Sequence, residues 1–179
     1  MRRFLDHLYQ GAGIAAGACI VLMTLLILAQ IVGRWFGIVI PSTEDFSGFL
    51  LAAASFLALA YTLRSGGHIR VTLVIGHIQG LPRRLLEGTI LLLALGLAGF
   101  TAWACAYLVY ESWQFQELSQ GYIPVPLWIP QLPMALGLVI LCIALLDELV
   151  QLLRGGRPAY LAHDEGAAVA PAADGDREP

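Results

Sequence analysis

The sequence predicts an all-α membrane protein with four transmembrane helices and both termini in the cytoplasm. The 179 residues are 58% hydrophobic and only 13% charged, whereas an ordinary soluble domain is about 45–50% apolar and about 25% charged. Four apolar stretches are each long enough to cross a hydrocarbon core of about 30 Å, which needs roughly 20 helical residues. Nine of the ten basic residues, all arginines, fall on one predicted side of the membrane.

The four spans are expected at about residues 11–33, 46–63, 88–110 and 127–150. The first span is longer than the apolar region of about 7–15 residues found in a cleaved signal peptide and has no good cleavage site, so we expect it to be retained. Pro130 and Pro133 lie in the first turns of the fourth span. Because proline is tolerated at a helix start and kinks a helix further in, we expect a bent or loosely wound start there.

The second span has a recognisable start at Pro41-Ser42-Thr43-Glu44-Asp45. A hydroxyl and two carboxylates stand at the positive end of the helix, and the Ser42-x-x-Asp45 spacing approximates a capping box. Two interpretations of the carboxylates stay open. Glu44 and Asp45 either only cap and solvate the helix, or one of them pairs with Arg34 across the outer loop.

Small residues recur at a four-residue spacing in the first two spans and predict close helix packing, within the chain or against a partner. They are Gly13 and Gly17, Gly48 and Ala52, Ala54 and Ala58.

The segment from Ser65 to Arg84 is too polar to span and too apolar for an ordinary loop. Gly66-Gly67 would end the second span, and an apolar stripe beyond it predicts a helix along the inner interface, with an irregular loop as the alternative.

We expect residues 1–157 to form one four-span membrane domain. Residues 158–179, rich in Ala, Gly, Pro and Asp, are expected to be a disordered cytoplasmic tail.

The arginines set the predicted orientation, because short cytoplasmic loops carry an excess of basic residues. Only Arg34 falls on the outer side, in the predicted loop 34–45. The other outer loop is expected at residues 111–126.

No chemistry-bearing motif lies within the spans. Secondary transporters generally hold an acid, a histidine or an unwound polar stretch near midplane, and here the middles contain none. The four histidines lie outside the spans, and Cys19, Cys105 and Cys142 are isolated. We therefore expect no cofactor, no metal site, no catalytic residue and no nucleic-acid partner. On these grounds the chain is expected to be a partner subunit rather than an enzyme.

A set of landmarks in a fixed order resembles the small permease (DctQ-like) subunit of tripartite ATP-independent periplasmic transporters. The similarity covers roughly Phe4 to Arg154, and it rests on the four-span layout, the size and four motifs. The motifs are Gly33-Arg34 at the end of the first span, Ser42 and Glu44 at the start of the second, Gly66-Gly67-His68-Ile69-Arg70-Val71 just inside, and Pro126-Leu127-Trp128-Ile129-Pro130 before the fourth. The family pattern has an acidic residue where this chain has Thr72.

The resemblance implies a non-catalytic subunit in the bacterial inner membrane. It would act as a scaffold for a large multi-span permease subunit that imports organic acids, such as dicarboxylates, with sodium. A periplasmic substrate-binding protein would deliver the solute, and membrane lipid would contact the spans. The residues that we expect at interfaces or as anchors are Arg34, Ser42, Glu44, Gly66, Gly67, His68, Arg70, Trp128 and Pro130.

We expect Arg34 to be exposed outside, where it can meet an acidic lipid, Glu44 or the binding protein.

Two other classes of function stay open from the residues. One is a free-standing four-span structural or assembly protein. The other is a small membrane enzyme or self-contained exporter, which would need the midplane ionisable group, paired thiols or ligand histidines that the sequence lacks.

Overall fold

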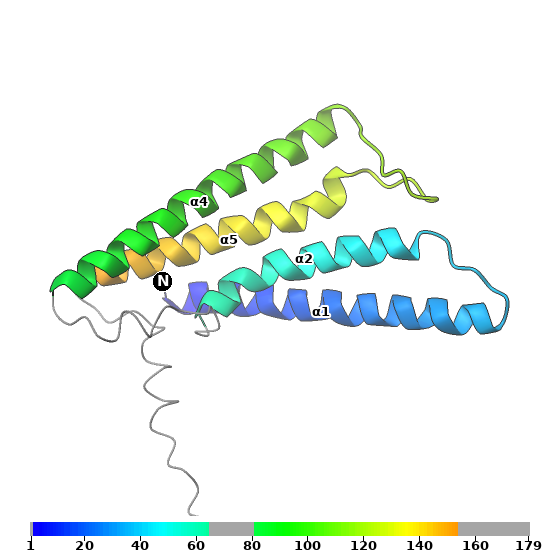
Figure 1. Ribbon diagram of the computed structural model, residues 1–179, viewed down its shortest axis with the longest axis horizontal. Coiled ribbons are helices and arrows are strands. Elements are labelled where there is room, and N and C mark those ends of the chain that lie inside the picture. The colour runs from blue at the N-terminus through cyan, green and yellow to red at the C-terminus, as the bar shows by residue number, and fades with distance from the viewer. Residues whose placement is uncertain (1, 65–80, 154–179) are drawn as a thin grey trace, which may run out of the picture.

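The computed structural model describes residues 2–64 and 81–153. It places four helices there, which are labelled in Figure 1 as α1 (Arg2–Trp35), α2 (Thr43–Arg64), α4 (Leu81–Gln114) and α5 (Trp128–Leu153). By length and composition, each contains a stretch able to cross a membrane. Within the described ranges there is no strand, only an isolated bridge between Leu118 and Pro126. The predicted all-α fold with four membrane helices is therefore confirmed.

The helices extend beyond the predicted spans. α1 and α4 have 34 residues each, which at 1.5 Å per residue is about 50 Å and exceeds a hydrocarbon core of about 30 Å. Residues 81–84, assigned from the sequence to the segment between the spans, instead begin α4. The rest of the predicted interfacial helix and the predicted tail lie outside the described residues.

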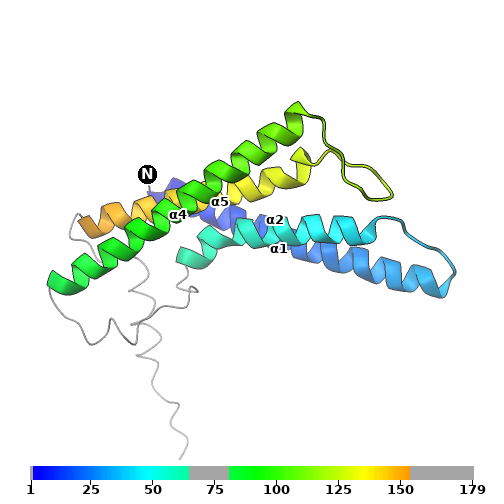
Figure 2. The same ribbon diagram turned by 45° about the horizontal axis from the view of Figure 1, so that its top comes forward.

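The four helices lie side by side in the spatial order α1, α2, α5, α4, as Figures 1 and 2 show from two directions. The main contacts are α1 with α2, α2 with α5, and α5 with α4. Two helical hairpins are thus joined through their second helices, and α1 and α4 form the outer edges. The beginning of α1 and the end of α5 lie at the same end of the molecule, as an even number of spans requires.

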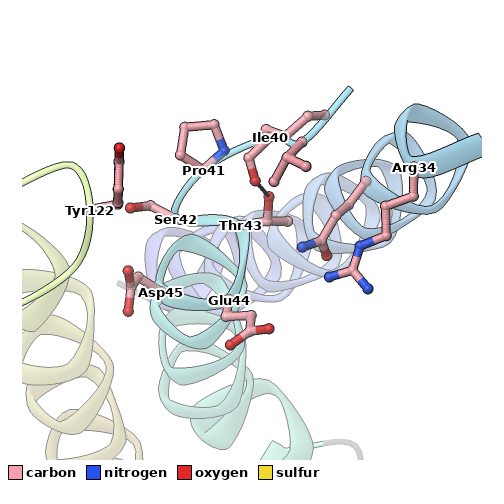
Figure 3. Close-up of a pocket in the computed structure, with 10 residues that line it drawn as sticks. Arg34, Ile40, Pro41, Ser42, Thr43, Glu44, Asp45 and Tyr122 are labelled. Carbon is pink, nitrogen blue, oxygen red and sulfur yellow. Dashed lines mark hydrogen bonds between the residues drawn. The ribbon is translucent and has the colours of Figure 1, made fainter. Parts of the chain in front are cut away.

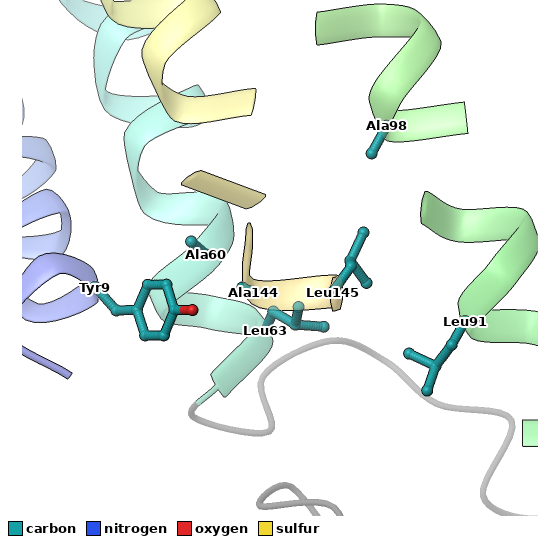
Figure 4. Close-up of a cluster of buried hydrophobic side chains, with 7 residues drawn as sticks. All are labelled: Tyr9, Ala60, Leu63, Leu91, Ala98, Ala144 and Leu145. Carbon is teal, nitrogen blue, oxygen red and sulfur yellow. The ribbon is translucent and has the colours of Figure 1, made fainter. Parts of the chain in front are cut away.

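A cluster of buried apolar side chains lies toward this end, which we call the inner end after the orientation expected from the arginines. Tyr9 reaches from α1 toward Ala60 of α2, and Ala144 and Leu145 of α5 lie beside them (Figure 4). Leu63, Leu91 and Ala98 complete the cluster. Most of these positions carry small or medium side chains, which lets the helices approach closely.

Two helices approach closely at Gly137 of α5, which packs on the backbone of α2. A Cβ on Gly137 would lie 2.9 Å from the Leu57 nitrogen and still closer to the Phe56 carbonyl group. In α1, a Cβ on Gly13 would lie 3.0 Å from Cγ of the Tyr61 ring, so this member of the predicted small-residue pairs does pack within the chain. Gly17 and Gly48 face open space instead.

Two helices end in the same hydrogen-bonded motif at the other end of the molecule, the outer end. After α1, the Ile38 N–H donates to the Gly33 carbonyl at 2.8 Å and the Gly37 N–H donates to Arg34 at 3.1 Å, with Gly37 at φ 74°. This is a Schellman motif, in which glycine supplies the left-handed residue. After α4, Gln116 takes that place at φ 52°, with bonds from Glu117 to Ser112 and from Gln116 to Trp113. Both loops that leave these helices therefore start in a defined direction.

Candidate functional site

A cavity of about 570 Å³ lies at the outer end, where α1 stops and α2 begins. Its walls come from the last turns of α1, the connecting loop, the first turn of α2 and one residue of the α4–α5 loop. The lining residues are Gln30, Arg34, Val39, Ile40, Pro41, Ser42, Thr43, Glu44, Asp45 and Tyr122. Figure 3 shows most of them around the space. We refer to this feature as the outer cavity.

The start of α2 is fixed by its hydroxyl side chains. Thr43 is buried, and its hydroxyl donates to the Ile40 carbonyl at 3.1 Å (Figure 3). The Ser47 hydroxyl donates to the Thr43 carbonyl at 2.7 Å. The Thr43 bond holds the loop against the first turn, and Pro41 precedes the turn with a fixed φ. The wall of the outer cavity is therefore set by local sequence.

Ser42 does not act mainly as the predicted capping-box residue. Its hydroxyl accepts a hydrogen bond from the Ile123 N–H of the α4–α5 loop at 2.8 Å, a contact across 81 residues of sequence. Its own backbone has φ 57°, whereas a capping residue usually has an extended backbone. The Ser42 carbonyl still accepts the first helical bond, from Phe46 at 3.1 Å. The hydroxyl therefore joins the two hairpins at the outer end.

The α4–α5 loop folds back on itself to reach Ser42. The Ser119 N–H donates to the Val125 carbonyl at 2.8 Å, and the Leu127 N–H donates to the Glu117 carbonyl at 2.9 Å. At the tip, Gly121 lies against the Asp45 carboxylate with no room for a Cβ. Tyr122 follows and is 87% exposed. A side chain at position 121 would therefore require the Asp45 carboxylate to move.

The charges of the outer cavity are mixed. Arg34 and Glu44 point into the same space, and Asp45 lies on the side of the α4–α5 loop (Figure 3). Across residues 2–64 and 81–153 the structure gives no ion pair between Arg34 and either carboxylate, so of the two interpretations left open from the sequence, the pairing with Arg34 is not formed. Both carboxylates stand in the first turn of α2, where the helix dipole favours negative charge. The cavity thus combines one cation with two anions.

The sequence-predicted site residues fall into three groups. Arg34, Ser42 and Glu44 meet at the outer cavity. Trp128 and Pro130 lie in the first turn of α5, half-buried, and do not line the cavity. The third group, Gly66, Gly67, His68 and Arg70, lies outside the described residues.

Two buried carboxylates at the inner end were not singled out from the sequence. Glu87 of α4 is 8% exposed and Glu148 of α5 is 5% exposed, and both take part in an interaction. Beside them, the Gln151 amide donates to the Asp147 carboxylate at 2.9 Å. Arg83 and Arg84 stand at the start of α4 close to Glu87 in the sequence, and this is the signal that could have indicated a polar contact there.

No group of three or more His, Cys, Asp or Glu side chains that could hold a metal ion occurs in the part of the chain that the structure describes. The outer cavity offers recognition by charge and hydrogen bonding, provided by one guanidinium and two carboxylates.

Comparison with known proteins bears on this arrangement. The family model described as "Tripartite ATP-independent periplasmic transporters, DctQ component" matches residues 23–155, which include the C-terminal part of α1 and all of α2, α4 and α5. No curated protein matches the chain.

Proposed function

We propose that this chain, which belongs to the DctQ family of small membrane components of tripartite ATP-independent periplasmic transporters, is a non-catalytic scaffold beside a large permease subunit. The transporter would import organic acids with sodium, and a periplasmic binding protein would deliver the solute. The solute and sodium sites would lie on the large subunit.

The observation that carries this proposal is the open row of four helices without charge in the middle of any of them. No Asp, Glu, Lys, Arg or His lies in residues 8–33, 46–63, 88–110 or 128–146. An intramembrane charge usually marks an ion or substrate pathway. The row also leaves long apolar faces of α1 and α4 exposed. Such faces suit contact with lipid and a larger membrane partner, and they support a structural role.

The arginine distribution supports an orientation with both termini in the cytoplasm. In that orientation the outer cavity and both outer loops face the periplasm. Tyr122 at the tip of the α4–α5 loop and Phe36 after α1 then project where a binding protein would dock. Trp128 and Tyr122 would lie near the outer headgroups, where aromatic side chains are enriched.

Uptake into proteoliposomes tests the proposal. Vesicles holding this chain alone, the large permease subunit alone, or both together would be given the binding protein, labelled organic acid and an inward sodium gradient. We expect uptake only when both membrane subunits are present, because the transport path lies in one and its support in the other. Uptake by this chain alone would contradict the proposal, and so would full uptake without it.

A further inference from the structure

The outer cavity lies at the depth of lipid headgroups. The apolar run of α1 ends just before Gly33-Arg34, and that of α2 begins at Phe46, directly after Asp45. Two helical residues, such as Gly33 and Arg34, extend about 3 Å along the helix axis beyond the end of the apolar run. The headgroup region on each side of the hydrocarbon core is about 5–7 Å thick. Arg34, Glu44 and Asp45 therefore stand within the headgroup layer of one leaflet. This step requires only that the four helices span the membrane.

Exposed apolar side chains lie in the cavity wall and directly after Arg34 in the chain. Trp35 is 81% exposed and Phe36 is 75% exposed, and Val39 in the cavity wall is also exposed. Tryptophan and other amphipathic aromatics gather at membrane interfaces. A molecule that enters the cavity with a polar head thus has apolar surface beside it for a chain.

The mixed charge of the outer cavity determines which kind of polar head group it can bind. A purely anionic group would meet Arg34 but also two carboxylates, whereas a purely cationic group would meet the carboxylates but also Arg34. A zwitterion can satisfy both signs at once. The side chains of Arg34 and Glu44 are available for this, because neither side chain has a hydrogen-bond or ion-pair partner among residues 2–64 and 81–153. Charge-assisted hydrogen bonds of this kind are about twice as strong as neutral ones.

We propose that the outer cavity binds the phosphoethanolamine headgroup of a phospholipid, with the phosphate on the Arg34 guanidinium and the primary ammonium on the Glu44 carboxylate. Guanidinium matches phosphate geometry through paired N–H donors. A primary ammonium has three N–H donors for a carboxylate, whereas the quaternary ammonium of choline has none. The volume of about 570 Å³ is within the range of about 300–1,000 Å³ found for small-molecule sites.

Native mass spectrometry of the full chain in mild detergent tests this site. The chain would be titrated with phosphatidylethanolamine, phosphatidylcholine and phosphatidylglycerol that carry identical acyl chains. We expect phosphatidylethanolamine to bind about tenfold more tightly than either of the others, a difference of about 1.4 kcal/mol. Equal affinity for the three lipids would overturn the proposal.

Substitutions identify the residues that bind the head. Arg34→Gln and Glu44→Gln should each remove most of the preference, and the double variant Arg34→Glu with Glu44→Arg should recover part of it because both signs are kept. Glu111→Gln is the matched control: it removes a carboxylate at the outer end that does not line the cavity. Loss of the preference in Glu111→Gln as well would overturn the assignment. Unchanged thermal unfolding would show that the variants are folded.

Two further outcomes concern the source of the zwitterion. Soluble glycerophosphoethanolamine should compete poorly, because it lacks the acyl chains that contact Trp35 and Phe36. Equal competition at the same concentration would overturn the lipid assignment in favour of a soluble solute. If Arg34→Gln instead released a bound protein and left lipid retention unchanged, the cavity would be a protein-docking site and the proposal would be wrong. Neither result would bear on the scaffold function, which uptake measures.

Discussion

Ser42 is the residue through which the two hairpins meet at the outer end. A left-handed backbone costs a non-glycine residue about 1–2 kcal/mol, and the bond that its hydroxyl accepts from Ile123 returns a net of about 0.5–1.5 kcal/mol. The two terms nearly offset each other. Serine at this position therefore contributes a specific contact more than it contributes stability.

Ser42→Ala and Ser42→Gly separate the hydrogen bond from the backbone conformation. Both remove the acceptor, so amide hydrogen exchange at Ile123 should become faster in both. Ser42→Ala should lose about 1 kcal/mol of stability and unfold at a lower temperature. The stability of Ser42→Gly should change little, because glycine adopts the left-handed conformation without cost and so offsets the lost hydrogen bond. Unchanged exchange at Ile123 in both variants would show that the bond does not join the hairpins.

At the scale of the elements, the α2–α5 contact joins the two hairpins along their length. It depends on Gly137, since the backbone of Phe56 and Leu57 occupies the space that a side chain would need. By contrast, Gly96 of α4 has no atom within 4 Å of its Cβ position. Both glycines lie inside a helix, but Gly137 packs against the backbone of another helix whereas Gly96 faces open space.

Gly137→Ala should therefore destabilise the protein by about 1–3 kcal/mol, the usual cost of overpacking. Gly96→Ala is the matched control and should be neutral or stabilising by up to about 1 kcal/mol, because alanine is the better helix former. Thermal unfolding of both variants in the same detergent measures the difference. A loss of stability in Gly96→Ala as large as in Gly137→Ala would mean that α2 and α5 do not meet at this glycine.

The elements themselves were predictable, because in lipid a helix must be long and apolar, and both properties are local. The contacts between elements were not. The sequence indicated Gly13 as a packing residue, but Gly137 has no small partner four residues away that would mark it. The outer cavity was half-predictable: Arg34 and Glu44 carry charges beyond the ends of spans, whereas the bond from Ile123 to Ser42 depends on the path of a loop 81 residues away.

At the scale of the whole molecule, the row of four helices has two open apolar faces and a charged outer end. The exposed side chains of α1 and α4 are mainly large and apolar, as contact with lipid or with another membrane protein requires. Membership of the DctQ family gives a reason for this exposure. Under the proposed scaffold function, this apolar surface contacts the large permease subunit and lipid.

The orientation of the row can be measured by labelling single cysteines. In a chain whose native cysteines are replaced by alanine, Tyr122→Cys should react with a membrane-impermeant maleimide in intact spheroplasts. His7→Cys should react only after lysis, because the arginine-rich inner end is expected to face the cytoplasm. The reverse pattern would place the outer cavity in the cytoplasm.

The most direct test of the scaffold function is to identify what accompanies the chain out of the membrane. The tagged chain would be expressed in its native host, extracted in mild detergent, and analysed by quantitative mass spectrometry. The account predicts a many-span permease in a one-to-one ratio, retained through size-exclusion chromatography. Recovery of this chain alone, monodisperse and stable, would contradict the account and indicate a free-standing four-span membrane protein.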